Sequence, residues 1–222
     1  EYTTLDARPE LPVLRPDGEK PRVLLLVDRR GWAYDTAAQA ISLCLADEFE
    51  FRIDYVCESP DLNAWPFDLI YVFFWGENYH QAFVRDPRRV LKEISSHRWA
   101  LEQSYGRLSP EQAATRYLGD AGTLTATSRR LQAIFAPYRD VQWCPNGFDP
   151  QRFSPGRDRT GPLRIGWAGN QDDPCKGLRD IIEPATNGDF ELVIAGGDLD
   201  GQAMSVFYRS IDVLCVASTA EG

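Results

Sequence analysis

The chain has 222 residues, of which 43% are hydrophobic and 26% charged, and this usage is typical of a globular protein. Acidic side chains outnumber basic ones by 33 to 24, so the net charge of −9 argues against a nucleic-acid-binding surface over the whole chain. No apolar run approaches the roughly 18 residues of a membrane-spanning helix. The first residues lack the basic and apolar regions of a signal peptide. We therefore expect a cytoplasmic protein without a transmembrane segment.

The five cysteines are widely spaced and form no C-x-x-C pair. Their number is odd and most of them lie within apolar runs, so we expect reduced, buried thiols rather than a disulfide framework. They are Cys44, Cys57, Cys144, Cys175 and Cys215.

Residues 1–21 are rich in proline and charge, and we interpret them as an extended lead-in, because proline biases its predecessor away from the helix. Structure is expected from residue 22, where Val23 to Val27 form a continuous apolar run typical of a strand in a covered parallel sheet. A turn over 28–32 precedes a helix whose predicted N-cap is Asp35. Further strands are expected within 51–56, 67–75, 90–95, 124–128 and 141–144, and helices from Ser109 and near 129–135.

A polar stretch with two prolines and two glycines follows at 154–162, and we place a domain boundary there, between residues 155 and 156. The alternation then restarts, with strands expected at 163–168, 190–195 and 213–217 and helices at 176–185 and near 202–210. Three strands and two helices make half of a Rossmann-like domain. The fold class is therefore α/β, and we expect the second domain, 156–222, to be incomplete, since the sequence ends soon after its third strand.

The clearest chemical pattern joins Gly169 and Asn170, directly after a strand, to Lys176 and Gly177 at the expected start of a helix. A glycine lets backbone approach a ligand, helix N-terminal N–H groups bind anions, and a lysine adds a positive charge. These residues predict a cradle for a diphosphate. A tight turn with an ordinary surface lysine explains the same residues, although Lys176 is one of only three lysines in the chain.

Other candidate binding residues also follow expected strands. Gly196 and Gly197 come after the second strand of the second domain, and Glu221 comes after the third. In the first domain, Gly31 lies in the first strand-to-helix turn and His97 ends a strand. Each can contact a ligand at the carboxyl edge of a sheet, and a hydroxyl-rich sugar would suit Glu221. Turn geometry or a structural role explains the three glycines and His97 equally well.

Together these residues resemble the family-4 glycosyltransferases of the GT-B fold. The segment PNGFD at 145–149, with Phe153 and Pro155, is similar to the family's interdomain segment. Residues 165–177 resemble its phosphate loop, and residues 192–218 its next two strands. The final AEG is similar to the start of its E-x(7)-E motif. The resemblance is clear over 141–222 and weak over 22–140.

The resemblance implies a GT-B-like pair of Rossmann-like domains that moves a sugar from a nucleotide diphosphate to a glycan, lipid or protein acceptor. Retention of anomeric configuration is expected, with no metal and no other bound cofactor. Lys176, Gly169, Asn170 and Gly177 would then hold the donor diphosphate, and Gly31, Gly196 and Gly197 would make other donor contacts. Glu221 would contact the donor and His97 the transferred sugar.

Two other functions remain open. A GT-B nucleotide-sugar 2-epimerase shares the architecture, and a non-catalytic GT-B-like binding module is favoured by Asn170, which stands where many family members carry arginine. Peripheral membrane contact is a further alternative. It is suggested by the basic stretch Arg85, Arg88, Arg89 and Lys92. These side chains would either contact anionic lipid or polysaccharide, or form a solvated face.

Overall fold

The structure is a computed structural model that describes residues 19–156, 160–186, 188, 190–197 and 199–220. The chain divides between Pro145 and Asn146 into two compact units, each with its own parallel sheet. The expected α/β class with Rossmann-like sheets is confirmed. The division falls before the boundary expected after residue 155. Of the expected lead-in, only residues 19–21 lie within the described part of the chain.

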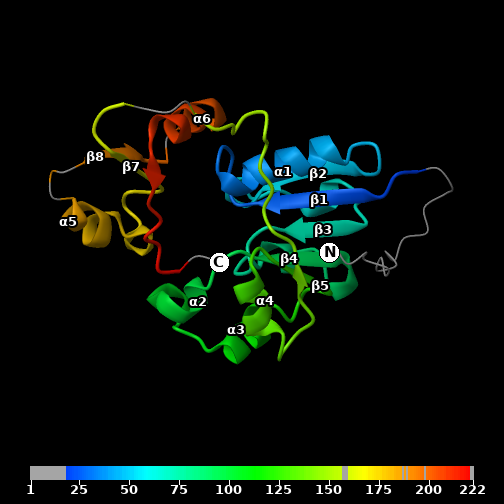
Figure 1. The fold of residues 1–222 in the computed structure, drawn as a ribbon. Coiled ribbons are helices and arrows are strands. Elements are labelled where there is room, and N and C mark those ends of the chain that lie inside the picture. The colour runs from blue at the N-terminus through cyan, green and yellow to red at the C-terminus, as the bar shows by residue number, and fades with distance from the viewer. Residues whose placement is uncertain (1–18, 157–159, 187, 189, 198, 221–222) are drawn as a thin grey trace, which may run out of the picture. The chain divides into compact units, whose positions relative to one another are not determined.

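The first unit contains a six-stranded parallel sheet in the order β2-β1-β3-β4-β5-β6. Figure 1 shows β2, β1, β3, β4 and β5 side by side in this order. The strands are β1 (Arg22–Val27), β2 (Glu50–Tyr55), β3 (Leu69–Val72), β4 (Val90–Ile94), β5 (Thr123–Ala126) and β6 (Gln142–Trp143). The α-helices are α1 (Ala33–Cys44), α2 (Arg98–Leu101), α3 (Pro110–Tyr117) and α4 (Arg129–Phe135). Short 3-10 turns are η1 (Val56–Glu58), η2 (Leu62–Ala64), η3 (Tyr79–Ala82), η4 (Pro87–Arg89) and η5 (Gln103–Tyr105).

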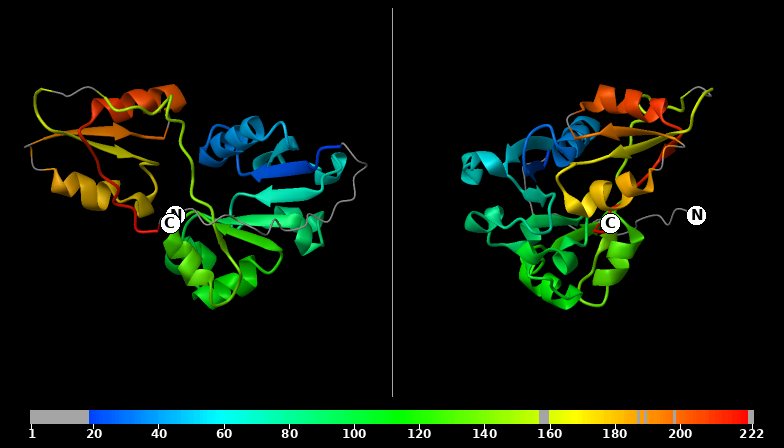
Figure 2. Two further views of the ribbon diagram at one scale, coloured as in Figure 1. Left: turned by 45° about the vertical axis from the view of Figure 1, so that its right-hand side comes forward. Right: turned by 90° about the vertical axis from the view of Figure 1, so that its left-hand side faces the viewer.

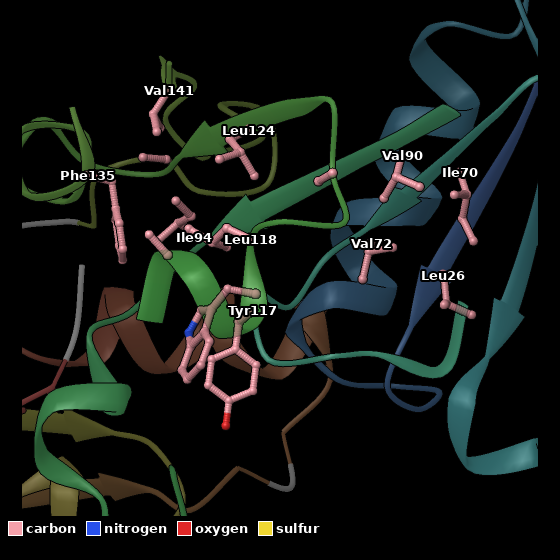
Figure 3. Close-up of a cluster of buried hydrophobic side chains, with 14 of the residues drawn as sticks. Leu26, Ile70, Val72, Val90, Ile94, Tyr117, Leu118, Leu124, Phe135 and Val141 are labelled. Atoms are coloured by element: carbon pink, nitrogen blue, oxygen red, sulfur yellow. The ribbon is translucent and has the colours of Figure 1, made fainter. Parts of the chain in front are cut away.

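Strand β1 is buried on both faces, as its unbroken apolar run predicts. Alternate side chains point to opposite faces, so Leu24 and Leu26 belong to one core cluster and Leu25 to another. The first cluster packs against α2, α3 and α4, and the second against α1. Figure 3 shows side chains of the first cluster, which come from β1, β3, β4, β5 and the helices on that face.

Two helix starts test the local sequence signals. The capping box expected from Ser109 is present, because its hydroxyl accepts from the Gln112 N–H at 3.2 Å and the Gln112 side chain accepts from the Ser109 N–H at 2.8 Å. The prediction of Asp35 as an N-cap is wrong. Helix α1 has Trp32 as its N-cap, and Asp35 lies in its first turn, where its carboxylate accepts from the Gly31 N–H at 2.7 Å.

The second unit contains a three-stranded parallel sheet in the order β8-β7-β9. Its strands are β7 (Arg164–Ala168), β8 (Glu191–Ala195) and β9 (Val213–Leu214). Its helical elements are the 3-10 turn η6 (Pro174–Lys176), the π-helix η7 (Leu178–Ile182), α5 (Glu183–Ala185) and α6 (Gly201–Ser210). Within this unit, α6 covers one face of the sheet and η7 with α5 the other, as Figure 2 shows.

The helix expected over 176–185 is wrong in its type and its start. A 3-10 turn ends at Lys176, and Gly177 then takes a left-handed conformation with φ +69°, so the helical segment begins at Leu178. Its first part is a π-helix. Pro184 has no N–H and its ring crowds the carbonyl four residues earlier, which disfavours regular α-helical bonding at this point.

Two further expectations need correction. The strand expected over 213–217 is confined to Val213–Leu214. The thiols are free, but none of them is buried: three are exposed and two are partly exposed. The apolar residues beside Cys44, Cys144 and Cys215 are themselves exposed, among them Leu43, Trp143 and Val216, so an apolar stretch of sequence did not indicate burial here. None of the helices in the described part of the chain is long and apolar enough to cross a membrane.

Candidate functional site

Each sheet has a point where the direction of its connections reverses. From β7 the chain passes to β8 on one side, and then returns to β9 on the other side of β7. From β1 the chain passes to β2 and then to β3 in the same manner. Open α/β sheets bind ligands at such switch points, at the carboxyl ends of the strands. In the second unit this places the candidate site where the loops after β7 and β9 meet.

These two loops are held together by backbone contacts. The Thr219 N–H donates to the Cys175 carbonyl at 2.9 Å. A Cβ atom on Gly177 would lie 2.6 Å from the Ala217 carbonyl oxygen, closer than real Cβ atoms come. Glycine is therefore required at this position both for its left-handed conformation and for the close approach of the two loops.

The structure brings five of the predicted binding residues together at this edge. A Cβ on Gly169 would lie 3.5 Å from Cδ of Lys176, so the lysine side chain lies beside the glycine. A Cβ on Gly197 would lie 3.6 Å from the Gly169 carbonyl and 3.9 Å from the backbone of Asn170. Gly196 directly follows β8, next to Gly197. The loops after β7, β8 and β9 therefore all contribute predicted residues or contacts to this edge.

The loop after β7 is shaped by its own polar side chains. Asn170 Oδ1 accepts from the Asp172 N–H at 3.1 Å, and the Asn170 carbonyl accepts from the Asp173 N–H at 3.2 Å. Asp173 Oδ1 accepts from the Cys175 N–H at 3.0 Å. Such local bonds are typical of Asx turns. The side-chain oxygen of Asn170 therefore accepts a hydrogen bond from within the loop. The N–H groups of its side-chain amide are left to donate to a ligand.

The π-helix supplies backbone donors next to Lys176. The first carbonyl oxygen that accepts a hydrogen bond from this helix is that of Gly177. It accepts from the N–H groups of Ile181 and Ile182 at 3.2 and 3.1 Å. The first N–H groups of a helical segment have no partner within it. The segment therefore directs N–H groups toward the loop that carries Lys176, which is the environment that an anionic ligand requires.

Gly31, the predicted residue in the β1–α1 turn, has a conformational role. Its φ is +75°, and a Cβ there would meet nothing within 4 Å, so conformation rather than space favours glycine. Its N–H is committed to Asp35, which also accepts from the Tyr55 hydroxyl at 2.8 Å. Burial alone would raise the pKa of Asp35, but these hydrogen bonds outweigh it and hold the pKa below its usual value.

His97 lies after β4 at the start of α2, as a partly buried side chain whose ring centroid is 6.3 Å from that of Trp99. It belongs to the first unit, as does Gly31, whereas Gly169, Asn170, Lys176, Gly177, Gly196 and Gly197 belong to the second. Glu221 lies outside the described residues.

The basic stretch considered for membrane or polysaccharide contact does not form one cationic surface. Lys92 is fully buried and bonds to Asp120. Arg88 pairs with Asp86 at 2.8 Å, and Arg89 donates to the carbonyls of Phe67 and Asp68. Three of the four side chains thus have partners within the first unit: Lys92 and Arg89 bond to residues distant in sequence, whereas Arg88 stays exposed beside Asp86.

Two side chains of β4 in the first unit have shifted pKa values. Burial raises the pKa of Glu93, and the Tyr71 hydroxyl donates to its carboxylate. Burial also lowers the pKa of Lys92, against the opposing effect of Asp120. These groups lie within strands β3 and β4 of the first unit, whereas the candidate anion site lies in the second unit.

Sequence reasoning missed Trp167, which is 1% exposed, donates to the Lys176 carbonyl, and lies 3.2 Å from the position that a Cβ on Gly169 would occupy. Its position in an expected strand indicated only a core residue. It also missed an apolar cavity of about 380 Å³ between α6 and the segment before β7, lined by Phe148, Phe153, Ser154, Pro155, Gly156, Ser205 and Tyr208. None of the predicted binding residues lines this cavity. Among the described residues there is no cluster of histidine, cysteine and acidic side chains that could hold a metal ion.

The fold and the switch points define an α/β protein with two Rossmann-like parallel sheets. The sequence matches no protein-family model, and no curated protein is significantly similar to it.

Proposed function

We propose that the protein is a glycosyltransferase that binds the diphosphate of a nucleotide sugar in its second unit. The observation that carries the proposal is the position of Lys176 beside Gly169, at the switch point where the loops after β7 and β9 are bonded together. The resemblance of residues 141–222 to the family-4 glycosyltransferases supports the same ligand. The first unit would bind the acceptor, with His97 contacting the transferred sugar and Gly31 making a further donor contact.

In the proposed reaction, the bond between the anomeric carbon and the diphosphate oxygen breaks, and a hydroxyl oxygen of the acceptor bonds to that carbon and loses its proton. Negative charge develops on the departing diphosphate. The ammonium group of Lys176 and backbone N–H groups after Gly177 would stabilise this charge, and a preorganised positive site of this kind lowers the barrier to departure. Gly169 would let the phosphate oxygens approach the backbone without meeting a Cβ.

The direct test is binding of nucleoside diphosphates to the full chain. ADP, GDP and UDP would each be titrated calorimetrically and in thermal unfolding. A ligand at one hundred times its Kd stabilises the folded state by about 2.7 kcal/mol. Lys176→Ala should weaken the best diphosphate about tenfold or more, since a charge-assisted contact contributes about 1.4 kcal/mol or more.

The matched control is Lys20→Ala. Lys20 is an exposed lysine of the first unit whose ammonium group donates to the Ala46 carbonyl, so its loss should leave diphosphate affinity unchanged. If no diphosphate binds, or if both variants bind like the parent chain, the proposal is refuted.

Product analysis separates the alternative functions. Transfer releases nucleoside diphosphate and a glycosylated acceptor, whereas a 2-epimerase leaves the acceptor unaltered. The basis for a non-catalytic binding module is Asn170, which stands where many members of the family carry arginine. Diphosphate binding without turnover of any nucleotide sugar would support that module and exclude both enzymes.

A further inference from the structure

Trp167 occupies a central position in the second unit. Neighbouring side chains of β7 point to opposite faces of the sheet, so Gly166 faces Phe207 of α6 and Trp167 faces the other side. There it packs with Leu178 and Ile182 and is almost completely buried. Its indole thus lies beneath the segment that contains the candidate diphosphate site.

The indole contacts both ends of the loop between Gly169 and Lys176. Its Nε1–H donates to the Lys176 carbonyl at 3.1 Å. Two atoms of its six-membered ring lie 3.2 Å from the position that a Cβ on Gly169 would occupy. Cδ of Lys176 lies 3.5 Å from that same position. One rigid side chain therefore lies next to both the glycine and the lysine.

The hydrogen bond is important because of the local backbone. Lys176 ends a 3-10 turn, and Gly177 then reverses the chain with φ +69°, so a regular helix does not fix the Lys176 peptide. The buried indole N–H needs an acceptor, and the Lys176 carbonyl provides it, so the bond holds this peptide in one orientation. The ring has few rotatable bonds, so it holds the lysine backbone with little loss of entropy.

We propose that Trp167 is a positioning residue for the anion site: its indole N–H and ring fix the Lys176 turn against Gly169, so that the ammonium group lies where the diphosphate binds. The inference rests on the proposed function of this site. Positioning of a charge before the ligand arrives strengthens its interaction with that ligand, because no reorganisation is needed on binding.

Trp167→Phe tests the inference, because phenylalanine keeps an aromatic ring and removes the N–H. Calorimetry would measure the Kd of the best-binding nucleoside diphosphate for the parent chain, for each of Trp167→Phe and Lys176→Ala, and for the double variant. Trp167→Phe should weaken binding about three- to tenfold in the parent chain. In the Lys176→Ala chain it should change Kd less than twofold, since a residue that acts through the lysine has no effect once the lysine is absent.

Trp75→Phe is the matched control. Trp75 is also almost completely buried, and its Nε1–H donates to Ser96 Oγ at 3.3 Å, but it belongs to the first unit. It should leave diphosphate affinity unchanged. If Trp167→Phe does not fold, 3-benzothienylalanine placed at Trp167 keeps the size of the bicyclic ring and removes only the N–H.

The outcomes separate the two claims. If Lys176→Ala leaves Kd unchanged, the proposed function fails and this inference fails with it. If Lys176→Ala weakens binding, but Trp167→Phe has no effect or an equal effect in both chains, only the inference is overturned. An effect of Trp75→Phe equal to that of Trp167→Phe also overturns it, since general destabilisation would then explain the result.

Discussion

Lys92→Met would remove a fully buried charge from the first unit. The Lys92 ammonium group donates to the Tyr117 carbonyl at 2.8 Å and to both carboxylate oxygens of Asp120 at 2.9 Å. Methionine is flexible and of similar length, so the loss of packing is small. The main cost comes from a carboxylate that remains in the interior without its cation, and breaking a buried pair costs about 3–5 kcal/mol. Gln81 still donates to Asp120 at 2.9 Å, and His80 Nε2 lies 2.8 Å from it, so we expect the lower value.

Urea unfolding, followed by tryptophan emission and circular dichroism, measures this cost. With a slope near 2 kcal/mol per M, a loss of about 3 kcal/mol lowers the midpoint by about 1.5 M. Arg88→Met is the control, because Arg88 pairs with Asp86 at 2.8 Å while these side chains are 75% and 35% exposed. An exposed pair contributes less than about 1 kcal/mol. If Lys92→Met costs no more than Arg88→Met, the reasoning from burial is wrong.

Two further predictions concern pH and backbone conformation. Burial alone would raise the pKa of Asp120, but the hydrogen bond with His80 and the charge of Lys92 outweigh it and hold the pKa below its usual value of about 3.9. As pH falls below about 4, the unfolded chain therefore binds a proton that the folded chain does not, and the free energy of unfolding should fall by up to about 1.4 kcal/mol per pH unit. Unfolding of Asp120→Asn over the same pH range should show a shallower slope, and equal slopes would contradict the assignment. Gly177→Ala should destabilise the second unit by about 2 kcal/mol or more, because the clash with Ala217 adds to a cost of about 1 kcal/mol for the left-handed conformation. Gly31→Ala, whose Cβ would lie in open space, should show only the conformational cost of about 1 kcal/mol. Thermal unfolding of the two variants measures the difference.

The sequence signals that succeeded are local ones. The apolar run from Val23 to Val27 predicts a strand buried on both faces, and Ser109 with Gln112 predicts a capping box, because neighbours in sequence form these features. The failures depend on residues far apart in sequence. Lys92 can be buried because it forms an ion pair with Asp120, and the charge pattern around residue 92 does not indicate that partner.

The candidate site shows the same division. Glycine and lysine near an expected strand end predict an anion-binding loop, and the structure places Gly169 beside Lys176. Pro184 was visible in the sequence, but its effect on the hydrogen bonding of the preceding turn was overlooked. The contact between Gly177 and Ala217 was not predictable, because Ala217 follows some forty residues later in the chain. The role of Trp167 was also hidden, since strand periodicity identifies a buried side chain but not the carbonyl to which it donates.

Each sheet is assembled from one uninterrupted stretch of the chain. All strands of the first sheet precede Pro145, and all described strands of the second follow Asn146. During synthesis the first sheet can therefore pair completely while the second is still being translated, since domains generally fold as units from the N-terminus. If the strands of the small second sheet paired slowly or failed to pair, the first sheet would remain folded. A pause in translation after β6 would give the first sheet time to fold before the second is made.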